Sequence, residues 1–124
     1  MPHTEVLLFQ GDDGEVPLLA WFESIPERAR DDCLERLRLL EQLGHEIRRP
    51  HADYLRDGVH ELRAKREGVH YRMLYFFHGR KAVVVSHGFV KRQAAVPARE
   101  IDRAIERMKR FRARPEKHTF RPRK

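Results

Sequence analysis

Three β-rich segments separated by very short turns constrain the fold of this chain more than any other feature. They cover residues 59–66, 69–77 and 82–89, with Glu67-Gly68 in the first gap and His78-Gly79-Arg80 in the second. Turns this short join antiparallel neighbours, because a parallel pair needs a crossover of a dozen or more residues. The sequence therefore predicts a three-stranded antiparallel meander. By the period of two, Glu61, Arg63 and Lys65 share one face of it.

Helical patterns lie on both sides of the meander in the chain. A capping-box pattern, Ser24-Ile25-Pro26-Glu27, predicts a long helix with Ser24 as its N-cap, and Gly44 fits its end. Its apolar stripe contains Ala29, Cys33, Leu37 and Leu40, widened by Leu34 and Leu43. The other elements that we expect are a strand over 5–9, a short helix over 17–22 and a helix over 98–111.

The order β-α-α-β-β-β-α is that of an α+β domain with helices packed on one face of a small antiparallel sheet. We expect this domain to span residues 1–111. Residues 112–124 contain six basic residues, two prolines and Phe120 as the one anchor, so they are expected to form a flexible basic tail.

The charge of the chain is unevenly distributed. The 124 residues carry a formal net charge of +7, but residues 1–57 hold 7 basic and 13 acidic residues, whereas residues 58–111 hold 13 and 5. This asymmetry favours a surface for a polyanion in the second half of the chain, with a solvated charged surface as the alternative.

Several classes of protein are excluded by composition. No apolar run reaches the ~18 residues of a membrane span, and the start lacks the features of a secretory signal, so we expect a cytoplasmic protein that does not contact a membrane. The single cysteine, Cys33, forms no internal disulfide and has no neighbours at zinc-site spacing. Cys33 is therefore expected to be a small core residue, and we expect no metal site.

The second half of the chain resembles a known family in three linked signatures. These are Glu61-Leu62-Arg63, then Tyr71-Arg72 followed by Leu74-Tyr75-Phe76-Phe77, then His87-Gly88-Phe89 followed by Lys91-Arg92 and a helix. Their order is similar to that of HigB-like toxins, the phage-derived branch of the RelE/ParE toxin superfamily. The resemblance covers residues 5–111 and implies a RelE-like fold.

The resemblance also implies a function. Such proteins are toxins of type II toxin–antitoxin systems, are neutralised by a HigA-like helix-turn-helix antitoxin, and cleave messenger RNA on the ribosome without a metal ion or cofactor. In that reaction the 2′-hydroxyl attacks the adjacent phosphate. Two alternatives stay open, namely an RNA-binding or interaction module without nuclease activity, and a gyrase-inhibiting toxin of the sister branch.

The chemistry of such a reaction needs a proton acceptor, a proton donor and positive charge against the phosphorane. Arg72 is the first candidate for binding phosphate, with pairing to a buried carboxylate such as Glu61 as its alternative. Arg63 has the same two interpretations. His87 is the candidate acid or base, and its alternative is a hydrogen-bonded structural histidine.

Further cations complete the expected site. Lys91 and Arg92 follow the third meander strand and are candidate catalytic residues, with ordinary loop charge as the alternative. Four cations at turns are expected to attract RNA: Lys65, Arg66, Arg80 and Lys81. Tyr71 is expected either to stack on a base or to lie in the core.

One departure from the family pattern bears on catalysis. Ribonuclease members of the superfamily have lysines on the strand that corresponds to residues 59–66 and a tyrosine early in the C-terminal helix. Here Glu61 lies near one such lysine position, and Pro97-Ala98 stand near the tyrosine position. Since arginine stays protonated, a histidine or the ribosome would have to assist proton transfer.

Overall fold

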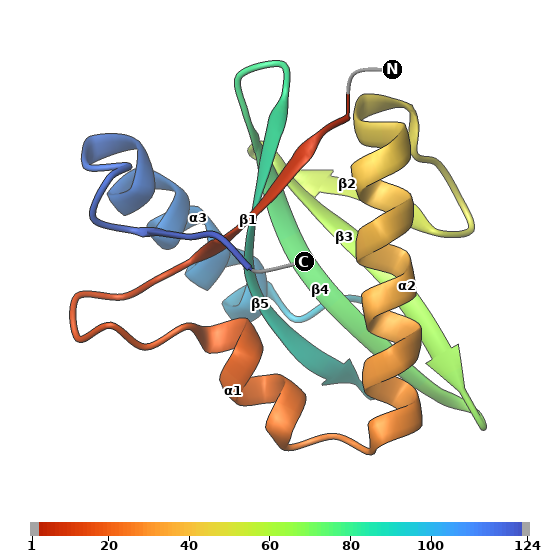
Figure 1. Ribbon diagram of the computed structural model, residues 1–124. Coiled ribbons are helices and arrows are strands. Elements are labelled where there is room, and N and C mark those ends of the chain that lie inside the picture. The colour runs from red at the N-terminus through yellow and green to blue at the C-terminus, as the bar shows by residue number, and fades with distance from the viewer. Residues whose placement is uncertain (1–2, 123–124) are drawn as a thin grey trace.

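A six-stranded sheet forms the centre of the computed structural model, which describes residues 3–122 (Figure 1). None of the helices in this range is long and apolar enough to cross a membrane. The elements in chain order are β1 (Glu5–Phe9), α1 (Pro17–Glu23), α2 (Glu27–Leu43), the 3-10 turn η1 (Gly44–Glu46), β2 (Ala52–Arg56), β3 (Val59–Arg66), β4 (Val69–His78), β5 (Ala82–Lys91), α3 (Ala98–Ala113) and β6 (Thr119–Phe120).

The predicted meander is confirmed as β3, β4 and β5. Glu67 and Gly68 have φ angles of 53° and 82°, as a two-residue hairpin turn requires, and they pair Arg66 with Val69. An additional hairpin precedes the meander, because Asp57 and Gly58 also adopt positive φ and join β2 to β3. The strand β2 is an addition to the elements that the sequence predicts.

The sheet is mixed rather than purely antiparallel, which corrects the expectation. Its strand order is β2-β3-β4-β5-β1-β6, and β1 runs parallel to β5. The direction of β1 is not set by a tight turn, because two helices and three strands separate it from β5 in the chain. An α+β domain is confirmed, with this change in the sheet.

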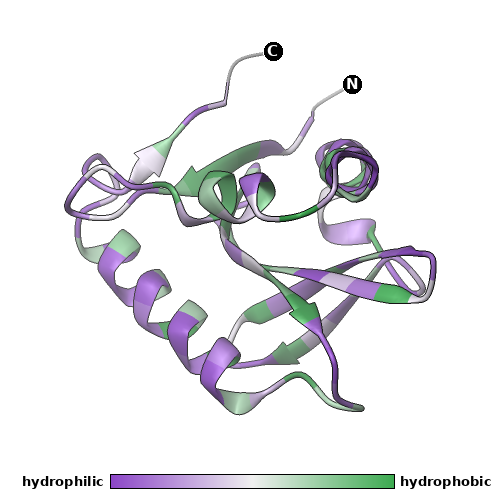
Figure 2. Ribbon diagram, turned by 90° about the horizontal axis from the view of Figure 1, so that it is seen from below, coloured by the Kyte–Doolittle hydropathy of each residue, from purple (hydrophilic) through white to green (hydrophobic). Residues whose placement is uncertain are grey.

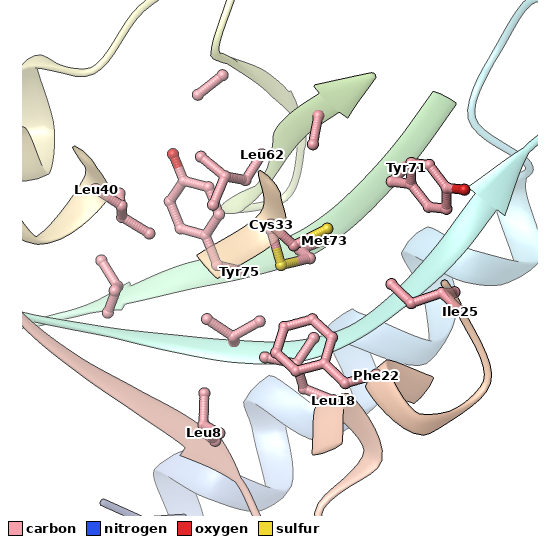
Figure 3. Close-up of a cluster of buried hydrophobic side chains, with 14 of the residues drawn as sticks. Leu8, Leu18, Phe22, Ile25, Cys33, Leu40, Leu62, Tyr71, Met73 and Tyr75 are labelled. Carbon is pink, nitrogen blue, oxygen red and sulfur yellow. The ribbon is translucent and has the colours of Figure 1, made fainter. Parts of the chain in front are cut away.

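Helices cover both faces of the sheet, whereas the sequence predicted one (Figure 2). Alternation along β4 provides both surfaces: Tyr71, Met73 and Tyr75 pack with α1 and α2, while Leu74 and Phe76 pack with α3. Figure 3 shows the first of these clusters, with Cys33 and Leu40 of α2 against the sheet. Because β4 is buried on both sides, it reads as a continuous apolar run.

The start of α2 differs from the predicted capping box. The helix begins at Glu27 after Pro26, and the Ser24 hydroxyl instead donates to the Trp21 carbonyl oxygen at 2.7 Å, where it ends α1. Because a proline disfavours the helical conformation of the residue before it, Ile25 stays outside the helix, which starts two residues later than the serine pattern indicates. The end at Gly44 is confirmed, and Leu34 and Leu43 are exposed rather than part of the buried stripe.

The expected flexible tail is packed onto the domain in its described part, to Pro122. Arg112 and Ala113 continue α3, and Thr119 and Phe120 pair with Phe9 and Leu8 of β1. His118 is 3% exposed, stacks on Phe9 and bonds the Gln10 carbonyl oxygen at 2.8 Å. The buried His118 and the pairing of β6 with the edge of β1 thus anchor a segment that composition alone describes as a tail. Residues 123–124 lie outside the described residues.

Gly88 of β5 lies directly beneath the Trp21 ring of α1. A Cβ atom at residue 88 would overlap the Cε3 and Cζ3 atoms of that ring. Trp21 also contacts Tyr71, with 6.2 Å between ring centroids. The glycine therefore allows α1 to approach the sheet, which explains its place in the third signature.

We expect Gly88→Ala to lower the free energy of unfolding by about 1–3 kcal/mol, because the added methyl group must displace the tryptophan. Chemical denaturation followed by circular dichroism measures this change. In a Trp21→Leu background the same substitution should cost much less. An equal cost in both backgrounds would contradict the role assigned to the ring.

Candidate nucleic-acid interface

Charged residues occupy one face of β3, β4 and β5 in register. Lys65, His70 and Lys91 lie directly opposite one another across the three strands, and we call them the basic row. Arg63 and Arg72 form the next row with Phe89. The predicted positions of Lys65, Arg63, Arg72 and Lys91 are thus brought together on one surface, at the end of the meander that α3 leaves open.

A surface groove of about 580 Å³ borders the basic row. It lies between the turn at Gly68 and the segment that follows β5, and we call it the His70 groove. Lys91 is half-buried and Arg92 is exposed. The residues that line the His70 groove are Gly68, Val69, His70, Val90, Lys91, Arg92, Gln93 and Ala94.

His70 is the histidine of this site, although the sequence placed His87 ahead of it as the candidate acid or base. Desolvation lowers the pKa of its imidazole below the usual 6.5, and the nearby charges of Arg72, Lys65 and Lys91 lower it further. The ring is therefore neutral at pH 7 and can accept a proton. The signal was in the sequence, because the two-residue turn at Glu67-Gly68 places His70 opposite Lys65.

A buried carboxylate joins the two candidate arginines. Glu61 is 3% exposed, and its Oε1 accepts from the Nε of Arg72 at 2.9 Å. Its Oε2 accepts from the Nη2 and Nε atoms of Arg63 at 2.8 and 3.1 Å. Asp53 of β2 lies 3.5 Å from the Arg63 guanidinium and also binds Arg49. The result is a chain of alternating charges across β4, β3 and β2.

Arg72 and Arg63 differ in their access to a ligand. The Arg72 side chain is 8% exposed, and its Nη1 donates to the Tyr71 carbonyl oxygen at 3.3 Å. Arg63 is 29% exposed, and within residues 3–122 its Nη1 has no hydrogen-bond partner. The pairing with Glu61, which the sequence left open for Arg72, is therefore present, and Arg63 is the arginine that solvent reaches.

His87 is enclosed beneath α3, away from the basic row. Its Nε2 lies 2.9 Å from Oε1 of Glu100, and its Nδ1 lies 2.8 Å from the Ser86 hydroxyl. Burial lowers the pKa of His87 to about 4, against the opposing effect of the bond to Glu100. A neutral ring that donates to Glu100 and accepts from Ser86 satisfies both contacts. The hydrogen-bonded structural interpretation of His87 thus agrees with its surroundings.

The other predicted RNA contacts are dispersed. Tyr71 is 5% exposed and packs in the cluster on the α2 side of the sheet. Arg66 is bound through its Nε to Asp32 of α2 at 2.5 Å. Arg80 and Lys81 are exposed in the turn between β4 and β5, about 30 Å from His70 at ~3.3 Å per residue. These four residues do not join the basic row.

The described residues hold no cluster of three histidine, cysteine or carboxylate side chains suited to a metal ion. The groups available for chemistry in the His70 groove are a neutral imidazole, the Lys91 ammonium group and the Arg92 guanidinium, and Lys65 lies beside them in the basic row. Together they can accept one proton and offset the charge of a phosphate.

This combination defines a small α+β domain with a basic groove on an exposed sheet face. The chain belongs to the family described as Phage derived protein Gp49-like (DUF891), whose model matches residues 20–109, and this is a RelE/HigB-like toxin family. The match runs from α1 to the last turns of α3. A search of curated proteins finds no match. Membership is compatible with the toxin of a toxin–antitoxin pair.

We expect Arg72→Met to lower the free energy of unfolding by about 3 kcal/mol, because it removes one of the two partners of a buried carboxylate. Thermal or chemical denaturation measures the loss. Arg63→Met, at the more exposed partner, should cost less, and adding Glu61→Leu to Arg72→Met should restore much of the stability. Wild-type stability in Arg72→Met would contradict a structural role for this pair.

We also expect the free energy of unfolding to fall as the pH is lowered from about 6.5 toward 4. In the unfolded chain His87 binds a proton near its usual pKa of 6.5, whereas in the fold it does so only near 4, so acid favours the unfolded state in this interval. Denaturation at pH 7, 6 and 5 measures the slope. His87→Gln should reduce it, and an unchanged slope would contradict the assignment.

Proposed function

We propose that this protein is the toxin of a type II toxin–antitoxin system and that it cleaves messenger RNA on the ribosome. The observation that carries the proposal is the basic row, in which a histidine with a lowered pKa lies between two lysines on an open sheet face. Membership of a toxin family supports the same conclusion. The site of action implies a cytoplasmic protein.

The proposed reaction uses the RNA as its own nucleophile. Neutral His70 accepts the proton of a ribose 2′-hydroxyl, whose oxygen attacks the adjacent phosphorus. The bond to the 5′-oxygen breaks and that oxygen takes a proton from the Lys91 ammonium group. Lys91, Arg92 and the free Nη1 of Arg63 offset the phosphorane charge, which is the largest need of such a reaction. The products are a 2′,3′-cyclic phosphate and a 5′-hydroxyl, and the reaction requires no metal ion.

Arg72 has an indirect role in this proposal. Arg72 holds the Glu61 carboxylate in place, and that carboxylate orients Arg63. The exposed guanidinium of Arg63 thereby keeps one edge for phosphate. The partner that blocks this activity is proposed to be a HigA-like helix-turn-helix antitoxin, as in related toxins.

A second candidate function is RNA binding without cleavage. The burial of Arg72 and His87 by internal partners favours it, because two of the expected catalytic groups are withdrawn from solvent. Such a module would use the same groove for phosphate and would leave the transcript intact.

Expression from a tightly controlled promoter should stop growth, and His70→Gln should relieve the arrest by removing the proton acceptor. Mapping of messenger RNA 5′ ends after induction should reveal new ends phased with codons in wild type and few in His70→Gln. The matched control is His51→Gln, which changes a half-buried histidine immediately before β2 and should remain toxic. Arrest without new RNA ends would favour the second candidate, and arrest with DNA damage would indicate gyrase as the target.

A further inference from the structure

Aromatic rings from four elements gather on the opposite face of the sheet, at the far end from the His70 groove. They belong to His45 of η1, Tyr54 of β2, His60 of β3, and Tyr75 and Phe77 of β4. His45 stacks on Phe77 with 3.7 Å between ring centroids, and His60 stacks on Tyr75 at 5.2 Å. Tyr54 meets His60 edge-on at 5.1 Å. These rings form one continuous wall, in which Tyr75 and Phe77 also pack in the core cluster on the α2 side of the sheet.

A groove of about 580 Å³ runs along this wall, and we call it the aromatic groove. Its volume lies within the range of small-molecule sites. Tyr54 is 55% exposed and His45 is exposed, so each presents ring surface to solvent. The groove also includes Arg48 and Arg49, from the segment between η1 and β2.

Charge in the groove favours an anion. Arg49 is neutralised by Asp53 at 2.6 Å. Arg48 instead donates through Nη1 to two backbone oxygens, those of His45 at 2.7 Å and Ile47 at 3.0 Å, and its Nε and Nη2 bind no carboxylate in the described residues. An exposed guanidinium with free donors thus lies beside a wall of rings.

Two groups on the wall can recognise a planar heterocycle. Tyr75 is 1% exposed and lines the groove, and Figure 3 shows its hydroxyl on the side of the ring away from Met73. Burial, followed by the charge of His45, lowers the pKa of His60, so that its ring is neutral and can both donate and accept. Flat ring surfaces, polar ring edges and one guanidinium match a base with its phosphate.

We infer that the aromatic groove binds a nucleotide of single-stranded RNA, with the base on the exposed rings and the phosphate on Arg48. The inference rests on the proposed function in that RNA is the ligand, but it concerns a second contact outside the cleavage site. The two grooves lie on opposite faces and near opposite ends of β4. A strand that reaches both would pass around the β2 edge of the sheet, where Tyr54 lies.

The test uses the full chain with His70→Gln, so that RNA is not cut. Titration with 5′-AMP, 5′-UMP and six-residue RNA oligomers, followed by nuclear magnetic resonance, should shift signals of His45, Tyr54 and Phe77. Tyr54→Ala should weaken binding of the oligomers about tenfold, since loss of one stacked base is worth ~1–3 kcal/mol. Arg48→Gln should weaken it several-fold and reduce its salt dependence.

Matched variants separate the expected effects from general ones. Tyr54→Phe keeps the ring and should bind nearly as wild type. Arg28→Gln removes an equal charge at the other end of α2 and should also leave binding unchanged. Circular dichroism on each variant confirms that it is folded.

Three results would overturn the inference. Shifts confined to the His70 groove would mean that RNA binds only there. If neither the nucleotides nor the oligomers bind, RNA is excluded as the ligand of the aromatic groove. Equal binding of hexaglutamate would indicate a surface for an acidic protein segment. Because this experiment measures binding, its result decides the inference even if the growth and RNA-end experiments refute cleavage.

Discussion

The two-residue turn at Glu67-Gly68 fixes the pairing of β3 with β4, and both faces of the sheet depend on it. With Arg66 opposite Val69, Lys65 meets His70, Arg63 meets Arg72 and Glu61 meets Leu74. A slip by one residue would exchange the two faces, burying charges among the apolar residues that contact α2. The same register therefore builds the α2-side core on one face, and on the other face it places the basic row beside the residues that pack under α3.

On the charged face of the sheet, residues of similar chemistry differ in burial and therefore in role. Glu61 binds both Arg72 and Arg63, but only Arg63 keeps a donor exposed. His87 and His70 lie on the same face, yet α3 encloses the first and leaves the second beside two lysines. Burial lowers the pKa of both histidines, but only His70 is reached by solvent. Position relative to α3 thus separates a structural histidine from a candidate base.

Much of the fold follows from local patterns, and the failures have identifiable causes. The meander, the end of α2 at Gly44 and the helix expected from residue 98 are all confirmed. The serine cap of α2 was wrong because Pro26 starts the helix later, and β2 was missed because a five-residue strand next to Pro50 has little signal. For the site, Arg63 and Lys65 share one face of β3 as the period of two predicted, and strand pairing brings Lys91 beside them, whereas Arg80 and Lys81 lie at the opposite end of the meander.

The sequence by itself determined the antiparallel meander, its turns and the alternation that separates charged from apolar residues, because these depend on neighbours within one hairpin. Tertiary structure decided the parallel pairing of β1 with β5, the placement of α3 on the second face and the docking of β6. It also decided which cations solvent can reach. Those outcomes depend on contacts between segments far apart in the chain, for which the local pattern contains no information.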